Sequence, residues 1–269
     1  MEMRKLLVVH DPNREEQPAL EIAARIAGDI GARILLFGCI HSEVSGAEYE
    51  NEEVKRLLRE HKARLDALLE PVAAMGVEVS SEVDWDKDWH HAIVRAAARD
   101  FADIVFKTSL RNPRRRVLKF TGDSILIREC LCPVLLIKRA EQRETSTILA
   151  AIDIKAKNPN YQKLNQHVIE FSRRVVATLQ ADVHIVNAFP DFRLVPDRAE
   201  IVEQTGVPSD HVHIKLGAPD KVIVDVAKNI DASLVVVGNS HRSGLAALLH
   251  GNTAEKILGK LQCNVLAMP

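Results

Sequence analysis

The chain repeats one order of sequence features in its two halves. Leu6–Asp11 is an apolar run that ends in an acid, and Ile148–Asp153 has the same form. Each of these runs is followed by apolar residues at helical spacing, and then by further apolar runs that alternate with helical segments. In a chain of 269 residues, this self-similarity predicts a duplicated folding unit rather than one large domain.

Each half contains five apolar runs that are short enough to be strands. A run without polar residues, such as Leu234–Val237, is typical of a strand buried on both faces. Strands that alternate with helices predict an α/β fold, with a parallel sheet and right-handed crossovers that put helices on both faces. The runs are Leu6–Asp11, Ala32–Phe37, Val77–Val83, Ile104–Phe106 and Val134–Ile137, and then Ile148–Asp153, Val183–Phe189, Val212–Leu216, Leu234–Val237 and Val265–Met268.

A polar segment at Arg139–Thr145 separates the halves and has no apolar periodicity, which is typical of a linker. We therefore predict one domain over residues 1–139 and a second over 145–269. The halves differ in one place. The first has a long amphipathic helical pattern at 54–72, whereas the second has only Phe189–Gly206, which prolines interrupt. Either this helix is shortened in the second half, or the sequence omits residues there.

Composition excludes several function classes. The net charge of -1 argues against a dominant attraction to nucleic acid or to an anionic membrane. No apolar run approaches the roughly 20 residues that span a bilayer. Four cysteines in a chain of this length do not form a disulfide framework. We therefore expect a cytoplasmic protein with no membrane and no direct nucleic-acid partner.

A glycine-bearing loop follows the Leu234–Val237 run. It begins at Gly238, and Gly251–Thr253 then opens a helical pattern. Glycine lets the backbone approach a ligand closely, and a helix N-terminus offers unpaired N–H groups to an anion. Together these features predict a phosphate cradle at the carboxyl edge of a parallel sheet, where ligands of such sheets usually bind. The alternative is that both glycines only make turns.

The spacing of this loop resembles the nucleotide loop of the universal stress protein family. That loop has a glycine, two residues, a second glycine, nine residues, a third glycine, and then serine or threonine. Gly238 fits the first position and Gly251 the third. His241 occupies the second glycine position, and Asn252 occupies the hydroxyl position, with Thr253 one residue later.

The resemblance covers nearly the whole chain. Leu6–Asn13 resembles the first strand of the family and its terminal acid, and the Gln262–Leu266 ending is similar to the tandem (type E) subgroup. The resemblance implies two Rossmann-like domains of the adenine nucleotide alpha hydrolase type, packed as a pseudo-dimer. It also implies antiparallel association of Val134–Ile137 with Val265–Met268, and a further homodimer is plausible.

For function, the resemblance implies a stress-response protein that binds or regulates and is not a catalyst. It implies an adenine nucleotide in the second domain, ATP with Mg²⁺ for example. Asp153 would hydrogen-bond adenine or ribose, Ala188 would offer its backbone, and the glycine loop would surround phosphate. The predicted binding residues are Asp153, Ala188, Gly238, Asn239, His241, Gly251, Asn252 and Thr253.

Two other functions stay open. A scaffold or small-ligand binder is favoured by the imidazole of His241 in the loop. A weak ATPase is the other alternative, although the sequence has no Walker motif and no obvious base. The loop of the first half, Lys107–Arg111, has no glycine and looks degenerate. The arginines at 111 and 114–116 either clamp an anion with their side chains or belong to a solvated loop.

Three groups of histidine or cysteine residues could suggest metal sites, but each has a simpler structural explanation. His90 and His91 are adjacent and point in different directions on a helix with no fixed ligand spacing, and Asp88 is more simply an N-cap. His211 and His213 share one face of a strand, but with no third ligand visible we expect surface histidines. The spacing of Cys130–Leu131–Cys132 is not that of a redox or zinc pair, so we expect buried or half-buried thiols.

Overall fold

The computed structural model describes residues 3–42, 51–109, 122–138, 146–179, 181–239 and 253–269. The described residues up to 138 form one compact unit, and those from 146 form another. Both are α/β, as the alternating pattern predicts. The predicted boundaries at 139 and 145 fall outside the described residues and stay predictions.

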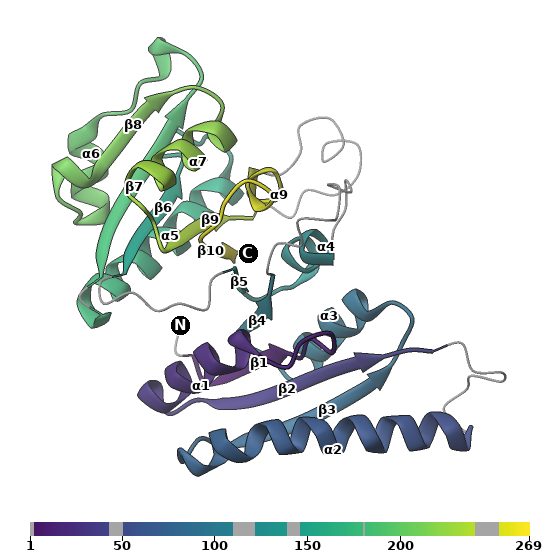
Figure 1. Ribbon diagram of the computed structural model, residues 1–269. Helices are drawn as coiled ribbons and strands as arrows, with labels where there is room; N and C mark the ends of the chain where they lie inside the picture. The colour runs from purple at the N-terminus through teal and green to yellow at the C-terminus, as the bar shows by residue number, and fades with distance from the viewer. Residues whose placement is uncertain (1–2, 43–50, 110–121, 139–145, 180, 240–252) are drawn as a thin grey trace. The chain divides into compact units, whose positions relative to one another are not determined.

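The first unit has a five-stranded parallel sheet in the order β3-β2-β1-β4-β5. Right-handed crossovers place helices on both faces, and α3 packs against α4 (Figure 1). The elements are β1 (Lys5–Val9), α1 (Pro18–Ile30), β2 (Arg33–Ile40), α2 (Glu52–Ala74), β3 (Val79–Trp85), α3 (Trp89–Arg99), β4 (Ile104–Thr108), α4 (Gly122–Glu129) and β5 (Val134–Ile137).

The second unit repeats this topology in the order β8-β7-β6-β9-β10, again with parallel pairs. In it α5 contacts α6, and α7 contacts α9. The elements are β6 (Thr147–Ile152), α5 (Pro159–Leu179), β7 (Asp182–Phe189), the 3₁₀ turn η1 (Phe192–Leu194), α6 (Arg198–Thr205), the 3₁₀ turn η2 (Ser209–His211), β8 (Val212–Leu216), α7 (Pro219–Asn229), β9 (Leu234–Gly238), α9 (Thr253–Leu258) and β10 (Asn264–Met268).

The second helix of the duplicated unit is long in the first unit and short in the second. Helix α2 has 23 residues, whereas its counterpart α6 has 8. The Asp197 side chain caps α6 by accepting from the N–H of Ala199, and Gly206 ends it in the left-handed conformation, with φ of 71°. The chain joins β7 to β8 through these short elements, so α6 is a short helix where the first unit has the long α2.

The central strands of both sheets are buried on both faces, which explains their unbroken apolar sequence. Leu6, Leu7 and Val8 of β1 have no exposed surface, and neither do Val235 and Val236 of β9. Helices complete each core with one apolar stripe. On α2 the buried residues of that stripe are Val54, Leu65, Leu69 and Val72.

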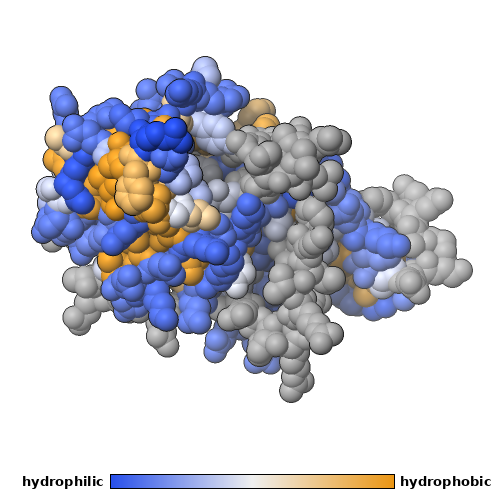
Figure 2. Space-filling model, turned by 90° about the horizontal axis from the view of Figure 1, so that it is seen from above, coloured by the Kyte–Doolittle hydropathy of each residue, from blue (hydrophilic) through white to orange (hydrophobic). Residues whose placement is uncertain are grey.

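Most of the described surface is hydrophilic, with apolar side chains gathered in one area of the face that Figure 2 shows in orange. The large apolar side chains most exposed in the second unit lie near the carboxyl ends of β7 and β8. They are Phe192, Leu194, Val195 and Leu216.

Phe106→Ala tests the core of the first unit. The Phe106 side chain on β4 is 1% exposed, so its removal should lower the free energy of unfolding by about 3–5 kcal/mol. Both tryptophans of the chain, Trp85 and Trp89, lie in this unit, so urea unfolding followed by tryptophan fluorescence reports on it.

Phe101→Ala is the matched control, since that ring is 78% exposed and contacts the Lys5 ammonium only as a weak cation–π pair. It should cost no more than about 1 kcal/mol. Equal losses for the two variants would contradict the burial of Phe106.

Candidate functional site

The carboxyl edge of the second sheet brings together four residues predicted to bind a ligand. Asp153 directly follows β6, whose neighbours are β9 and β7. Because Ile152 is paired with Asn187, Asp153 is level with Ala188 on β7. Because Ala151 is paired with Val237, it is also level with Asn239, just past Gly238. Strand order reverses between β6 and β9, and this is where ligands of open α/β sheets usually bind.

Asp153 is held in place by its backbone. Its N–H donates to Asn165 Oδ1 over 3.0 Å, and the Asn165 side-chain amide donates back to its carbonyl. The next N–H, of Ile154, donates to Oδ1 of the buried Asn187 over 2.9 Å. The Asp153 residue is exposed, yet partial desolvation raises the pKa of its carboxyl above the usual value. The backbone at Asp153 is therefore fixed at the sheet edge, and the residue is exposed there.

Gly238 and Asn239 form the start of the glycine loop. A Cβ on Gly238 would lie 3.2 Å from Leu164 Cβ, so the glycine allows α5 to pack closely against β9. Asn239 is 1% exposed, and its N–H donates to the Met268 carbonyl over 2.7 Å. The structure thus gives Gly238 a packing role, which does not depend on a ligand.

The rest of the predicted loop is only partly described. Thr253 is half-buried at the first position of α9, a helix of 6 residues. His241, Gly251 and Asn252 lie outside the described residues, so their predicted phosphate contacts stay predictions.

The corresponding edge of the first sheet is filled by its own side chains. Thr108 and Ser109 take the places of Gly238 and Asn239, since both pairs continue strands in the same register. Lys107 Nζ lies 2.8 Å from Asp123 Oδ1, and the Ser109 hydroxyl donates to the other oxygen of that carboxylate.

Burial alone would raise the pKa of the Asp123 carboxyl, but the Lys107 ammonium holds it below the usual value. The pair is 15% and 19% exposed. This internal ion pair satisfies the charges that an anionic ligand would otherwise use, which agrees with the degenerate loop predicted from the sequence. The arginines at 111 and 114–116 lie outside the described residues.

A cavity of about 280 Å³ lies elsewhere in the first unit, at the ends of β2 and β3 under α2. His10 and His61 meet beside it edge to face, with ring centroids 5.1 Å apart. Desolvation lowers the pKa of His10 to about 4 and also lowers that of His61, so both rings are neutral at pH 7. The cavity lining is Ile40, His41, Ser42, Leu57, Glu60, His61, Arg64 and Trp85.

Two of the simple readings from the sequence are confirmed. Asp88 caps α3, and its carboxylate accepts from the N–H of His91. Cys130 is buried and Cys132 half-buried, both as free thiols. Desolvation raises the pKa of the Cys130 thiol to about 12 and that of Cys132 to about 11, so neither forms a ready thiolate.

The sequence predicts His211 and His213 on one strand as surface histidines, but His211 ends η2 and only His213 lies on β8. Both are half-buried. Asp182 and His184 on the neighbouring strand face them, and the structure brings all four together. The signal was present in the sequence, because Asp182 and His184 also lie two residues apart. Only the pairing of β7 with β8 shows that the two pairs share one face.

The model of the universal stress protein family matches residues 2–138 and again 144–269. The chain belongs to the universal stress protein family. Two copies in one chain make it a tandem member, and the curated relatives that it matches over its full length include universal stress proteins of type E. The universal stress protein E homolog of Haemophilus influenzae is 27% identical over 100% of this chain and 98% of its own length. Universal stress protein E of Escherichia coli is 25% identical over 98% and 93%.

A solved structure extends this likeness to the fold. The crystal structure of a putative universal stress protein from Pseudomonas aeruginosa has a TM-score of 0.80, with 26% identity over 99% of this chain and 93% of its own. The tandem Rossmann-like architecture inferred from the sequence is thereby confirmed. No helix among the described residues of the tandem protein is long and apolar enough to cross a membrane.

Asp123→Asn tests the ion pair that fills the first site. Removing one charge leaves the Lys107 ammonium buried and unpaired, so the first unit should lose about 2–4 kcal/mol of stability in urea unfolding followed by tryptophan fluorescence. Lys107→Met combined with Asp123→Asn removes both charges and should recover at least half of that loss. Asp66→Asn breaks an exposed pair with Lys62 and should cost less than about 1 kcal/mol. A double variant as unstable as Asp123→Asn would contradict the buried pair.

The buried imidazole of His10 predicts acid sensitivity of the first unit. The unfolded chain binds a proton at His10 with the ordinary histidine pKa of 6.5, but burial lowers the pKa of His10 in the folded chain to about 4. Stability is therefore complete above pH 6.5 and falls as the pH drops toward 4, by up to about 3 kcal/mol. His10→Gln should remove most of this dependence of stability on pH. A smaller dependence should remain because of His61. The measurement is urea unfolding at several pH values; an unchanged slope in the variant would rule out His10 as the cause.

Proposed function

We propose that this tandem universal stress protein is a cytoplasmic stress-response protein that acts by binding, and that its second unit binds one adenine nucleotide. The observation that carries the proposal is the sheet edge where Asp153, Ala188 and Asn239 lie level at the reversal of strand order. The exposed carboxylate of Asp153 can accept hydrogen bonds from ribose hydroxyls or the adenine amino group. Backbone groups at Ala188 can complete the contact.

The asymmetry between the units supports a single nucleotide. In the first unit the ion pair of Lys107 and Asp123 occupies the equivalent place, while the described part of the second site has no such pair. The phosphates would extend toward the loop after Asn239, where Gly251, Asn252 and Thr253 offer small or polar groups and Mg²⁺ would accompany ATP. His241 stands where the family pattern has glycine, so we expect modest affinity.

A binding role is favoured over catalysis. Phosphoryl transfer needs a metal holder and an oriented nucleophile or base around the γ-phosphate. Among the described residues at this edge, Asp153 is the only carboxylate that we can assign to a ligand, and one carboxylate does not supply both a metal holder and a base. We therefore propose that bound ATP is retained and not turned over.

We also propose that the two units pair within the chain through β5 and β10. The support is the duplication itself, because both copies in one chain hold the partners at high effective concentration. Pairing would protect two strand edges that otherwise invite aggregation.

Calorimetric titration with ATP and Mg²⁺ tests the nucleotide proposal. We expect one equivalent to bind, and Asp153→Ala to weaken binding about tenfold, since a hydrogen bond to a charged group contributes roughly 1.5 kcal/mol or more. Asp11→Ala is the matched control, because Asp11 ends the first strand of the other unit and should leave the affinity unchanged.

Two outcomes would contradict this proposal: no heat at millimolar nucleotide, or equal losses in the two variants. Phosphate release measured on the same samples addresses catalysis. Turnover that Asp153→Ala abolishes would establish an ATPase in place of a binding protein.

A further inference from the structure

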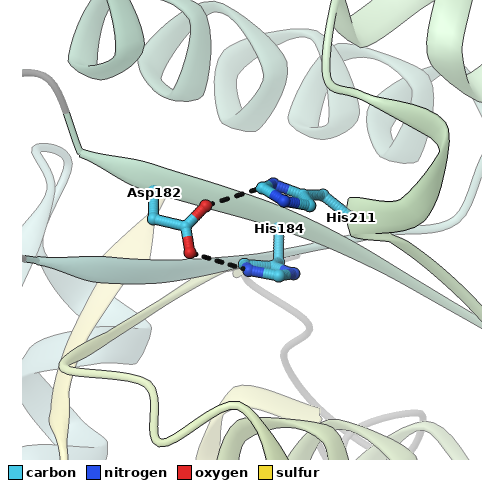
Figure 3. A group of neighbouring side chains, drawn as sticks. All are labelled: Asp182, His184 and His211. Atoms are coloured by element: carbon cyan, nitrogen blue, oxygen red, sulfur yellow. Dashed lines mark hydrogen bonds and ion pairs between the residues drawn. The ribbon is translucent and has the colours of Figure 1, made fainter.

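Four side chains with metal-binding chemistry gather at the amino ends of β7 and β8. Asp182 and His184 open β7, His211 closes η2, and His213 lies on β8. The strands are parallel neighbours, with Ile185 paired with Val212. Asp182 and His184 share a face of β7, and the centroid of the His184 ring lies 4.2 Å from that of His211 and 5.2 Å from that of His213, so the four side chains meet on one side of the sheet. Figure 3 shows the carboxylate of Asp182 beside the rings of His184 and His211, with one oxygen directed to each ring. These two rings are stacked.

The distances suit a small divalent cation. One ligand atom from each of Asp182, His184 and His211 lies within 4.8 Å of the others. Asp182 Oδ2 is 3.1 Å from His184 Nε2, and Asp182 Oδ1 is 3.1 Å from His211 Nδ1. Tetrahedral Zn²⁺ with bonds of about 2.0–2.2 Å holds its ligand atoms roughly 3.3–3.6 Å apart. Small side-chain rotations would therefore bring the three ligands to bonding distance.

His213 orients one of these ligands. Its Nε2 lies 3.0 Å from His184 Nδ1, so it can accept the proton of that nitrogen. This hydrogen bond selects the tautomer that leaves the lone pair of His184 Nε2 free, on the side of Asp182. Histidine ligands in metal sites usually have such a partner.

Without a metal ion, hydrogen bonds can hold the same side chains together. His211 Nδ1 also lies 3.3 Å from the Val183 carbonyl, so its N–H can be shared between this carbonyl and Asp182. A metal ion would replace that proton. Two cations that act on His213, Lys215 and Arg198, oppose a further positive charge, and the Asp182 carboxylate offsets them.

Burial leaves an entrance for an ion. The His184 side chain is 12% exposed, that of His211 29%, and that of Asp182 45%. The ion would thus be bound on its inner side by the mostly buried His184 and would be accessible to solvent on the side of Asp182. Three protein ligands leave the fourth position of a tetrahedral ion to water.

We propose that Asp182, His184 and His211 bind a divalent transition-metal ion of the Zn²⁺ class, with His213 as a positioning residue. A mixed imidazole and carboxylate set suits Zn²⁺, and Cu²⁺, Ni²⁺ or Co²⁺ can share it. The other histidine near carboxylates, His91, differs in geometry. Its two ring nitrogens face Asp88 and Glu129 separately, so these groups do not converge on one point.

The test uses the full chain, stripped of metal with a chelator and titrated with Zn²⁺ by calorimetry. We expect one equivalent to bind with micromolar affinity or better. Asp182→Asn keeps the size and shape of the side chain but removes its charge. This variant and His184→Gln should each weaken binding by about a hundredfold, and His213→Gln should weaken it by about tenfold. His91→Gln is the matched control and should bind like the unaltered chain.

Cobalt identifies the ligands directly. Co²⁺ bound at this site should give the visible absorption of a tetrahedral nitrogen and oxygen set, without the thiolate charge-transfer band that cysteine ligands produce. Circular dichroism and thermal unfolding of each metal-free variant show whether it is folded. The proposal is overturned if the unaltered chain binds no Zn²⁺, if folded Asp182→Asn binds as tightly as His91→Gln, or if the cobalt spectrum shows thiolate.

Discussion

Burial of the central strands on both faces is the constraint on which the rest of this structure depends. Side chains such as Leu7, Leu149 and Val236 have no exposed surface, so polar chemistry has no place along the middle of the sheets. It collects instead at the strand ends. Asp11 and Asp153 lie at the carboxyl ends of equivalent strands, and Asp182 with His184 lies at the amino end of β7. A parallel sheet of this kind therefore offers two edges for function, and the second unit carries candidate residues on both.

Duplication lets the two copies diverge on one scaffold. The strand order and register are the same in both units, but Thr108 replaces Gly238 and the pair of Lys107 and Asp123 closes the first site. The long helix α2 covers a cavity beside His10 and His61, whereas its counterpart α6 has only 8 residues. A chain with two copies can thus keep one ligand edge while the other becomes part of the core.

The fold was accessible from the sequence because its signals are local. Apolar runs, helical spacing and the acids after Leu6–Val9 and Ile148–Ile152 each depend on a few neighbouring residues. They predicted the alternation of strands and helices and the duplication. The family resemblance pointed in the same direction, and the family match agrees with it.

What the sequence missed depends on pairing between distant segments. Asp182 and His184 face His211 and His213 only because β7 and β8 are paired in one register. Lys107 forms an ion pair with Asp123, which lies 16 residues later in the sequence, so spacing alone does not reveal that they meet. The close packing of Gly238 on Leu164 likewise requires the position of α5, which no spacing within the glycine loop reveals.

Strand β7 has a consequence of its own, because it runs between the two edges of the second unit. Asp182 begins it and Ala188 lies near its end, so at about 3.3 Å per residue the two candidate sites are roughly 20 Å apart on one strand. Ligands at that separation do not collide, and both sites can be filled at the same time. Any influence of one on the other has to pass through a strand clamped between β6 and β8, and thermodynamic reciprocity makes that influence equal in both directions.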